Sequence, residues 1–557
     1  MEIGGEEIKT MSMDHHGLVA AMCQELGIAE KINKRIGSDD ERRVLSPGQS
    51  VEAMILNALG FTNRRLYLTH QFFETKPVER LLGGPVTAKD VTDYTLGHTL
   101  DEISKYGASK LFAEVAFEIA LENKDLLGAS NHLDSTSISV CGDYEKGSPT
   151  AIKLTHGFSK DHRPDLKQAV LSLIVNGPSA IPLWMEPLDG NSSDKKSFHE
   201  TIKKVNDFRK QIDLETEFKW IADAALYSKD KLLKQNDYLW LSRVPESILE
   251  AKNLVERDEK EVQWTPREKG YKTSSSISYY GGIKQRWLLV FSEQAYNREK
   301  KTLESKLARQ AEELKKKLWH LGNQLFNCEK DVKVEAAKVG KKYPFYQIES
   351  EVTPVLKYGK RGKPKAGEEK TLVGYKLKLD FKRDEETISN QLHRKGRFIL
   401  ATNDLDKEGF SDAQMLEEYK GQQHVEGGFR FLKDPWFMVD SVFLKKNSRI
   451  EALMMVMTLC LMVYNVSQYR LRQALKDQNE TLPNQLRKEI QNPTIRWIFQ
   501  FMEGVGIVRF YEDKIYQPIR EIITNLNALR KKIIYLFGEA ACKMYGLPWK
   551  GQLIESS

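Results

Sequence analysis

Residues 132–140, HLDSTSISV, and residues 219–227, KWIADAALY, are the two stretches that decide the fold. The first alternates and is rich in β-branched residues, and the second is an apolar run that ends at an acid. Both patterns are typical of β-strands. Each predicted strand carries one aspartate at its exposed end, Asp134 in the first and Asp223 in the second.

The segments around these two strands predict an alternation of strands and helices. Two apolar strands follow Asp134, and the residues Asn-Gly-Pro-Ser at 176–179 join them in a turn, because these residue types favour turn conformations. In chain order we expect strands 132–140, 168–175 and 180–185, helix 195–209, strand 219–223, helix 229–233 and strand 238–244.

A third acidic residue lies in residues 419–433, YKGQQHVEGGFRFLK. At helical spacing, Glu426 shares a polar stripe with Arg430 and Lys433, while apolar residues form a second stripe that can pack. A carboxylate among cations on one helix face indicates a site for a metal ion or a phosphate group. An ordinary amphipathic helix with a solvated charged face explains the same pattern, so this segment alone leaves both readings open.

The order of these elements, with an aspartate on each of two strands and a glutamate on a later helix, resembles the DDE transposases of prokaryotic insertion sequences. One group of these enzymes has the motif Tyr-x2-Arg-x3-Glu-x6-Lys, and Tyr419, Gln422, Glu426 and Lys433 match it at the correct spacing. Gln422 stands in place of the arginine, so Arg430 or a residue of a neighbouring chain would replace that cation. The resemblance spans roughly residues 90 to 505 and includes the stretches 155–168, 190–194, 241–245 and 492–497.

The resemblance implies an α/β, RNase H-like catalytic core with a mixed five-stranded sheet and helices. It assigns Asp134, Asp223 and Glu426 as catalytic residues and as ligands of two Mg²⁺ ions, for which Mn²⁺ could substitute. Hard oxygen ligands suit Mg²⁺, and paired ions can stabilise both the attacking and the leaving oxygen of an in-line displacement. The expected DNA contacts are Tyr419, Gln422, Arg430, Lys433, His162, Arg163 and Lys167. For the last three, a solvated basic loop is the alternative.

The resemblance also implies the partners. They are double-stranded DNA, as terminal inverted repeats and as target, and a second copy of the chain on the paired ends. Two other functions agree with the same residues. One is a metal-dependent DNA nuclease of the same core that cuts without joining. The other is a domesticated or decayed remnant that only binds DNA.

The resemblance implies a location in the cytoplasm of a prokaryote, at the nucleoid, and composition agrees with an enzyme that acts on DNA. The 557 residues include 85 Lys and Arg against 78 Asp and Glu, a formal net charge of +7, which favours contact with phosphate. The five cysteines show no Cys-x2-Cys pair, as expected in a reduced compartment. We expect no membrane contact, because the most apolar run, residues 452–463, is shorter than the about 20 residues of a membrane span.

The chain organisation that we expect has five parts. Asp223 and Glu426 are separated by 203 positions, more than such a core needs, so an insertion is expected between them. A heptad-like leucine seam within it is explained by packing inside the chain or by an intermolecular coiled coil. The parts are a helical, DNA-end-binding region (1–128), the first core part (129–248), a strand-rich insertion with a long amphipathic helix at 298–328 (249–405), the second core part (406–465) and a helical region that is a candidate for dimerisation (466–557).

Overall fold

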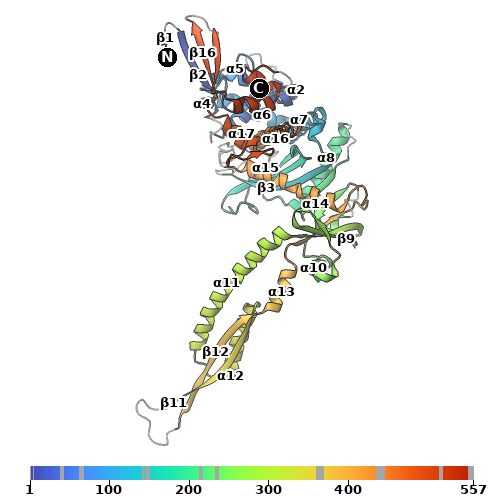
Figure 1. Ribbon diagram of the computed structural model, residues 1–557, viewed down its shortest axis with the longest axis vertical. Coiled ribbons are helices and arrows are strands. Elements are labelled where there is room, and N and C mark those ends of the chain that lie inside the picture. Colours follow the sequence, from blue (N-terminus) through green and yellow to red (C-terminus); the bar gives the residue numbers. More distant parts are fainter. Residues whose placement is uncertain are drawn as a thin grey trace. The chain divides into compact units, whose positions relative to one another are not determined.

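The computed structural model describes most of the chain (Figure 1). The residues outside the description are 1, 4–5, 38–42, 62–67, 141–143, 145–150, 213–216, 233–236, 359–368, 435–443, 445, 513–517 and 550–557. The chain divides into two compact units. The first comprises residues 1–228, 234–241 and 417–557, and the second comprises residues 229–233 and 242–416. All residues predicted to be catalytic belong to the first unit.

The core of the first unit is a mixed sheet with helices, which confirms that prediction. Its strand order is β5-β4-β3-β6-β7, in which β3 pairs antiparallel with β4 and parallel with β6. Nearly every residue of β4 is buried, as expected for a strand covered on both faces. The strands are β3 (Ser130–Val140), β4 (Lys167–Asn176), β5 (Ile181–Leu188), β6 (Lys219–Ala222) and β7 (Trp240–Arg243), the last two residues of β7 belonging to the second unit.

Helix α16 (Asn447–Asp477) is the central helix of this unit. It contacts β5, α3 (Pro47–Leu59), α6 (Asp93–Tyr106) and α7 (Ala108–Glu122). By length and composition it is the one described helix that could cross a membrane, but 83% of its most apolar window is buried inside the protein. A core helix has the same properties, and α16 contacts α15 (Gln422–Leu432), the helix that carries Glu426.

Segments from both terminal regions form a second sheet, so the prediction that the terminal regions are helical was wrong for these segments. Strand β2 (Glu6–Ser12) pairs with β16 (Gly506–Glu512), which pairs in turn with β17 (Arg520–Thr524); β1 (Glu2–Ile3) lies at the edge (Figure 1). Ile522 and Ile523 lie in the C-terminal region that the sequence predicts to be helical, but they pair with Val508 and Ile507 in strands. A short apolar run does not distinguish a strand from a helix.

The first unit also contains the following shorter elements: α1 (His16–Leu26), α2 (Ile28–Ile36), α4 (Thr69–Phe73), α5 (Val78–Leu82), α8 (Asp194–Gln211), β14 (Leu482–Pro483), β15 (Glu489–Ile490), α17 (Ile495–Phe501), α18 (Ala528–Leu536) and α19 (Glu539–Met544). Helix α8 was predicted at 195–209, which the structure confirms.

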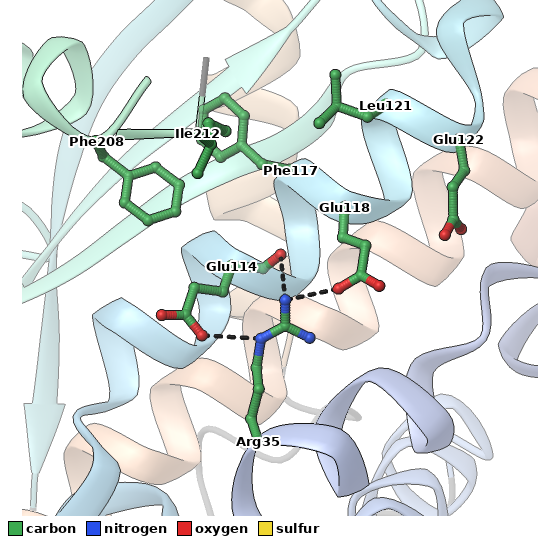
Figure 2. Close-up of a pocket in the computed structure, with 8 residues that line it drawn as sticks. All are labelled: Arg35, Glu114, Phe117, Glu118, Leu121, Glu122, Phe208 and Ile212. Carbon is green, nitrogen blue, oxygen red and sulfur yellow. Dashed lines mark hydrogen bonds and ion pairs between the residues drawn. The ribbon is translucent and has the colours of Figure 1, made fainter. Parts of the chain in front are cut away.

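A pocket opens beside α7 and α8, with an apolar side and a charged side (Figure 2). Phe117 and Phe208 contribute to the apolar side. On the charged side, the Arg35 guanidinium donates hydrogen bonds of 2.8 Å to Glu114 and 2.6 Å to Glu118. The positive charge of Arg35 is therefore balanced by the carboxylates of these two residues. The described residues that line this pocket include none of the side chains predicted individually as catalytic residues or DNA contacts.

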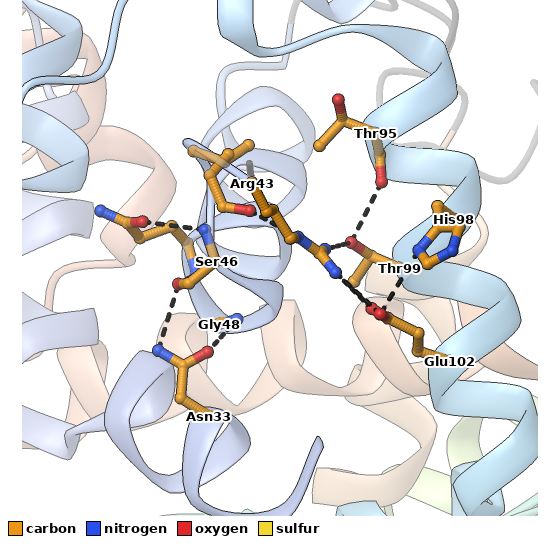
Figure 3. Close-up of polar contacts among 10 residues, drawn as sticks. Asn33, Arg43, Ser46, Gly48, Thr95, His98, Thr99 and Glu102 are labelled. Carbon is orange, nitrogen blue, oxygen red and sulfur yellow. Dashed lines mark hydrogen bonds and ion pairs between the residues drawn. The ribbon is translucent and has the colours of Figure 1, made fainter. Parts of the chain in front are cut away.

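Helix α3 begins with a capping box that ties it to α2 (Figure 3). Ser46 Oγ accepts a hydrogen bond from the Gln49 backbone N–H, and Asn33 Oδ1 accepts one of 2.7 Å from the Gly48 N–H. A Cβ atom at Gly48 would lie only 2.2 Å from the carbonyl oxygen of Ala29. The two helices therefore approach so closely that Glu52, one turn further along α3, is buried.

The second unit combines a small antiparallel sheet with a β-hairpin and two helices that contact this hairpin. Strands β8, β9, β10 and β13 pair in the order β13-β10-β9-β8. The elements are α9 (Lys229–Leu232), α10 (Leu249–Val255), β8 (Thr265–Arg267), β9 (Tyr271–Tyr280), β10 (Ile283–Ser292), α11 (Glu293–Asn323), α12 (Glu329–Lys342), β11 (Tyr346–Lys357), β12 (Thr371–Arg383), α13 (Glu385–His393), β13 (Arg397–Thr402) and α14 (Asp412–Lys420), whose last residues belong to the first unit.

The predicted leucine seam lies on α11, which runs beside the β11–β12 hairpin (Figure 1). Leu307 and Leu314 are fully buried in a cluster with residues of α12 and the hairpin, and the Tyr346 hydroxyl donates a 2.6 Å hydrogen bond to the Leu307 carbonyl. The helix ends at Asn323. Leu325, the next leucine at the spacing of the seam, follows the helix and is exposed. The seam therefore packs within its own chain.

Candidate active site

Two of the predicted ligands lie at equivalent positions along neighbouring parallel strands, Asp134 within β3 and Asp223 just after β6. In the register of β3 and β6, Asn131 is paired with Trp220 and His132 with Ile221. Asp134 and Asp223 each follow two residues after the last of these pairs. Adjacent strands lie about 4.8 Å apart. The register therefore directs both aspartates to the same end of this strand pair, where β6 stops.

The two aspartates differ in their backbone setting and in their exposure to solvent. Asp134 lies within β3, its side chain is one-fifth exposed, and its Oδ1 accepts a 2.7 Å hydrogen bond from the Ser135 N–H. Asp223 is the first residue after β6 and is exposed. Its Oδ1 accepts a 2.8 Å hydrogen bond from the Ala225 N–H, and its carbonyl accepts one from Leu226. A turn closed by a hydrogen bond to the aspartate side chain therefore follows the strand, and aspartate is common in such turns.

Helix α15 carries Glu426 and is fixed to β3 at its first turn. The Gln422 side chain is buried and donates a 3.0 Å hydrogen bond to the Leu133 carbonyl, next to Asp134. The side chain of Gln422 therefore packs against β3, and its predicted contact with DNA stays a prediction. Gln422 shares the buried face with Val425 and Phe429, whereas Glu426 points to the exposed face.

His132 lies under the junction of α14 and α15. A Cβ atom at Gly421 would lie 2.6 Å from His132 Cε1, so the helix backbone approaches the ring as closely as only glycine permits. Burial lowers the pKa of His132 to about 4, and the nearby His424 adds to this effect. The His132 imidazole is consequently neutral at physiological pH and acts as a packing element between β3 and the Glu426 helix.

Lys433, at the C-terminal end of α15, binds an acid of the loop between β3 and β4. Its Nζ donates a 2.6 Å hydrogen bond to Asp161 Oδ1. The next residue back, Lys160, has its Nζ 3.8 Å from Asp134 Oδ1. The loop therefore contacts both the strand of Asp134 and the helix of Glu426. These loop contacts were not predicted, although the basic character of the loop was.

The other predicted DNA contacts lie around this loop and helix. Arg430 is exposed, and its side chain, like that of Glu426, makes no ion pair or hydrogen bond with any residue that the structure describes. Tyr419 is half-buried near the end of α14, and Lys167 begins β4. His162 and Arg163 are exposed in the loop, where Arg163 pairs with Asp165 at 2.9 Å.

The three carboxylates do not form a ready-made ligand cluster. Within the described part of the chain, no group of three His, Cys, Asp or Glu side chains is placed to hold a metal ion. The structure aligns Asp134 with Asp223 through the strand register and fixes the helix of Glu426 to the same strand. In kind, the donor set fits Mg²⁺, because carboxylate oxygens are the ligands that this ion prefers.

Comparison with known families decides the class of this protein. Residues 132–463, more than half of the chain, match the family described as "Transposase DDE domain". The chain belongs to this transposase family. Residues 8–117 match a family described as a domain of unknown function, DUF4277. No curated protein matches the chain.

A solved structure of a transposase is among those similar to this chain. It is described as a piggyBac transposase synaptic complex with hairpin DNA, determined by cryo-EM. The identity is 12%, the coverage is 99% of this chain and 89% of that chain, and the TM-score is 0.33.

The two glycines after Glu426 have different roles in the transposase domain. A Cβ atom at Gly427 would meet no atom within 4 Å, whereas one at Gly428 would lie 3.0 Å from Leu461 Cδ2 on α16. We expect Gly427→Ala to raise the free energy of unfolding by about 1 kcal/mol, because glycine in a helix is less favourable than alanine. Urea denaturation followed by circular dichroism measures the change.

Gly428→Ala is the matched control for this prediction. The helix propensity gained is the same, but the new methyl group pushes against Leu461, so we expect no gain or a net loss of stability. An equal stabilisation by both substitutions would contradict the close packing of α15 on α16.

Proposed function

We propose that this protein is an insertion-sequence DNA transposase with an RNase H-like core, which cleaves DNA at terminal inverted repeats and joins the freed end to a target. The observation that carries the proposal is the parallel register of β3 and β6, which directs Asp134 and Asp223 to one end of the sheet. The hydrogen bond from Gln422 to Leu133 supports it, since it fixes the Glu426 helix to the same strand.

Asp134, Asp223 and Glu426 would hold the divalent cations in this function, and Mn²⁺ could replace Mg²⁺. Bound at these carboxylates, two such ions would supply activation of the attacking oxygen and stabilisation of the leaving oxygen of the phosphodiester. Asp223 is exposed at the end of β6, and Glu426 is exposed on α15, so both carboxylates are accessible to an ion and to DNA. The Ser135 N–H orients the carboxylate of Asp134.

Cationic side chains near these acids would bind the DNA backbone. Arg430 is one helical turn after Glu426 and exposed, and its planar guanidinium suits bidentate contact with a phosphate. His162 and Arg163 in the exposed loop, together with Lys167, would extend this surface. Lys433 would contact phosphate only after it leaves Asp161.

The partners in this proposal are double-stranded DNA and a second copy of the chain. Terminal inverted repeats and target DNA would be bound in the bacterial or archaeal cytoplasm at the nucleoid, with two copies acting on paired ends. The net charge of +7 supports contact with DNA, since it favours association with phosphate.

Strand transfer into a plasmid tests the proposal against its alternatives. A labelled duplex with the terminal repeat taken from the DNA that flanks the gene is incubated with the protein, Mg²⁺ and supercoiled plasmid. We expect cleavage at the repeat boundary and label joined to the plasmid. Cleavage without joining would identify a nuclease instead, and binding without cleavage would identify a DNA-binding remnant.

A further inference from the structure

Two consecutive charged residues of the loop between β3 and β4 bind opposite charges on two elements of the candidate site. Lys160 reaches Asp134 on β3, with 3.8 Å between Nζ and Oδ1. Asp161 accepts the 2.6 Å hydrogen bond of Lys433 on α15. The loop is therefore anchored to the strand of one candidate ligand and to the helix of another.

The ammonium group of Lys160 has a defined position beside Asp134. Its Nζ donates hydrogen bonds of 2.6 Å to the Ser135 carbonyl and 3.0 Å to Ser135 Oγ. The Lys160 backbone N–H donates a further bond of 2.9 Å to Ser137 Oγ, which fixes the loop along the strand. The side chain of Lys160 is only one-third exposed. These contacts hold a positive charge at the carboxylate.

We propose, on the basis of the function proposed above, that Lys160 is the resident cation of the site. Its ammonium group neutralises Asp134 and competes with a divalent cation for this carboxylate, so it has to move away before the cation binds there. The pair of Asp161 and Lys433 positions the loop for this contact. Lys160 thus acts through Asp134, and its charge sets the metal affinity of the site.

Mn²⁺ binding to the full-length protein without DNA tests this role, with the electron paramagnetic resonance signal of free Mn²⁺ as the readout. Lys160→Met keeps the length of the side chain and removes its charge. We expect it to lower the apparent Kd for Mn²⁺ about tenfold, since a neighbouring cation weakens cation binding by at least this order. Lys160→Arg keeps the charge and is expected to stay within about twofold of the wild type.

Two further variants make the outcome specific. Lys153→Met removes an exposed lysine of the same segment and measures the general effect of lost positive charge. Asp134→Asn tests the ligand itself and is expected to weaken Mn²⁺ binding. Unchanged or weaker binding by folded Lys160→Met protein, with Asp134→Asn still defective, would overturn the role of Lys160 alone. Wild-type Mn²⁺ binding by Asp134→Asn would overturn both this role and the ligand assignment.

Discussion

Asparagine in place of Asp223 is expected to lower the rate of DNA strand cleavage at least about a thousandfold, equivalent to about 4 kcal/mol of transition-state stabilisation. The amide keeps the size of the side chain and an acceptor for the Ala225 N–H. It removes the negative charge that would hold a divalent cation. Single-turnover cleavage of a labelled duplex with the terminal repeat measures the loss, and Glu426→Gln is expected to have an effect of the same order.

Binding and folding controls separate this loss from misfolding. Glu417→Gln neutralises another exposed carboxylate, on α14, and should cleave at the wild-type rate. Retention of the labelled duplex in a gel should be similar for all variants, because the carboxylates are not expected to bind the DNA backbone. Folded Asp223→Asn or Glu426→Gln protein that cleaves within tenfold of the wild type would contradict the assignment of that residue.

Glutamine in place of Glu52 is expected to raise the free energy of unfolding by about 3 kcal/mol at pH 7. Burial raises the pKa of Glu52 to about 8, and a hydrogen bond with the Ala29 backbone offsets part of this effect. Below pH 4.5 both folded and unfolded chains are protonated at this residue. As the pH rises from about 4.5 to 8, only the unfolded chain ionises, so stability falls.

The pH dependence identifies the cause of this stabilisation. Urea denaturation of the wild type and of Glu52→Gln should differ little at pH 4 and increasingly up to pH 8. Glu74→Gln, at an exposed glutamate, should change the stability little at either pH. A Glu52→Gln effect that is the same at pH 4 and pH 8 would mean that packing, and not ionisation, determines it.

The sheet that carries Asp134 could be predicted because its local signals agree with its tertiary surroundings. The strands predicted at 168–175 and 180–185 are β4 and β5, and the strand predicted at 132–140 is β3. Alternation and uninterrupted apolar runs suffice for this, because buried strands permit few other residues. The register of β3 and β6 could not be read from the sequence, since pairing between distant strands leaves no local signal.

The position of Gln422 on α15 differs from the one that the sequence motif suggests. Gln422 precedes Val425 by three residues and Phe429 by seven, which places it on the buried stripe, and the structure shows it there. Matching it to an arginine of the motif suggested a role on the surface instead. The helical period therefore predicts the buried position of Gln422, although a polar residue is usually expected at the surface.

The sheet formed by the terminal regions and the ion pair of the loop between β3 and β4 could not be predicted for a different reason. Strand β2 pairs with β16, nearly 500 residues later, and neither segment has strong alternation. The ion pair of Asp161 with Lys433 likewise joins residues 272 positions apart. Charges of opposite sign are common at the surface, so the sequence does not indicate which of them meet.

The most direct measurement is the anomalous scattering of Mn²⁺ in crystals of the full-length protein with its terminal-repeat DNA. If Asp134, Asp223 and Glu426 hold the catalytic ions, anomalous peaks will lie within about 2 to 2.5 Å of carboxylate oxygens of all three residues, beside the scissile phosphate. Peaks at other residues, or a complex with ordered DNA in which these carboxylates bind no Mn²⁺, would contradict the proposed active site.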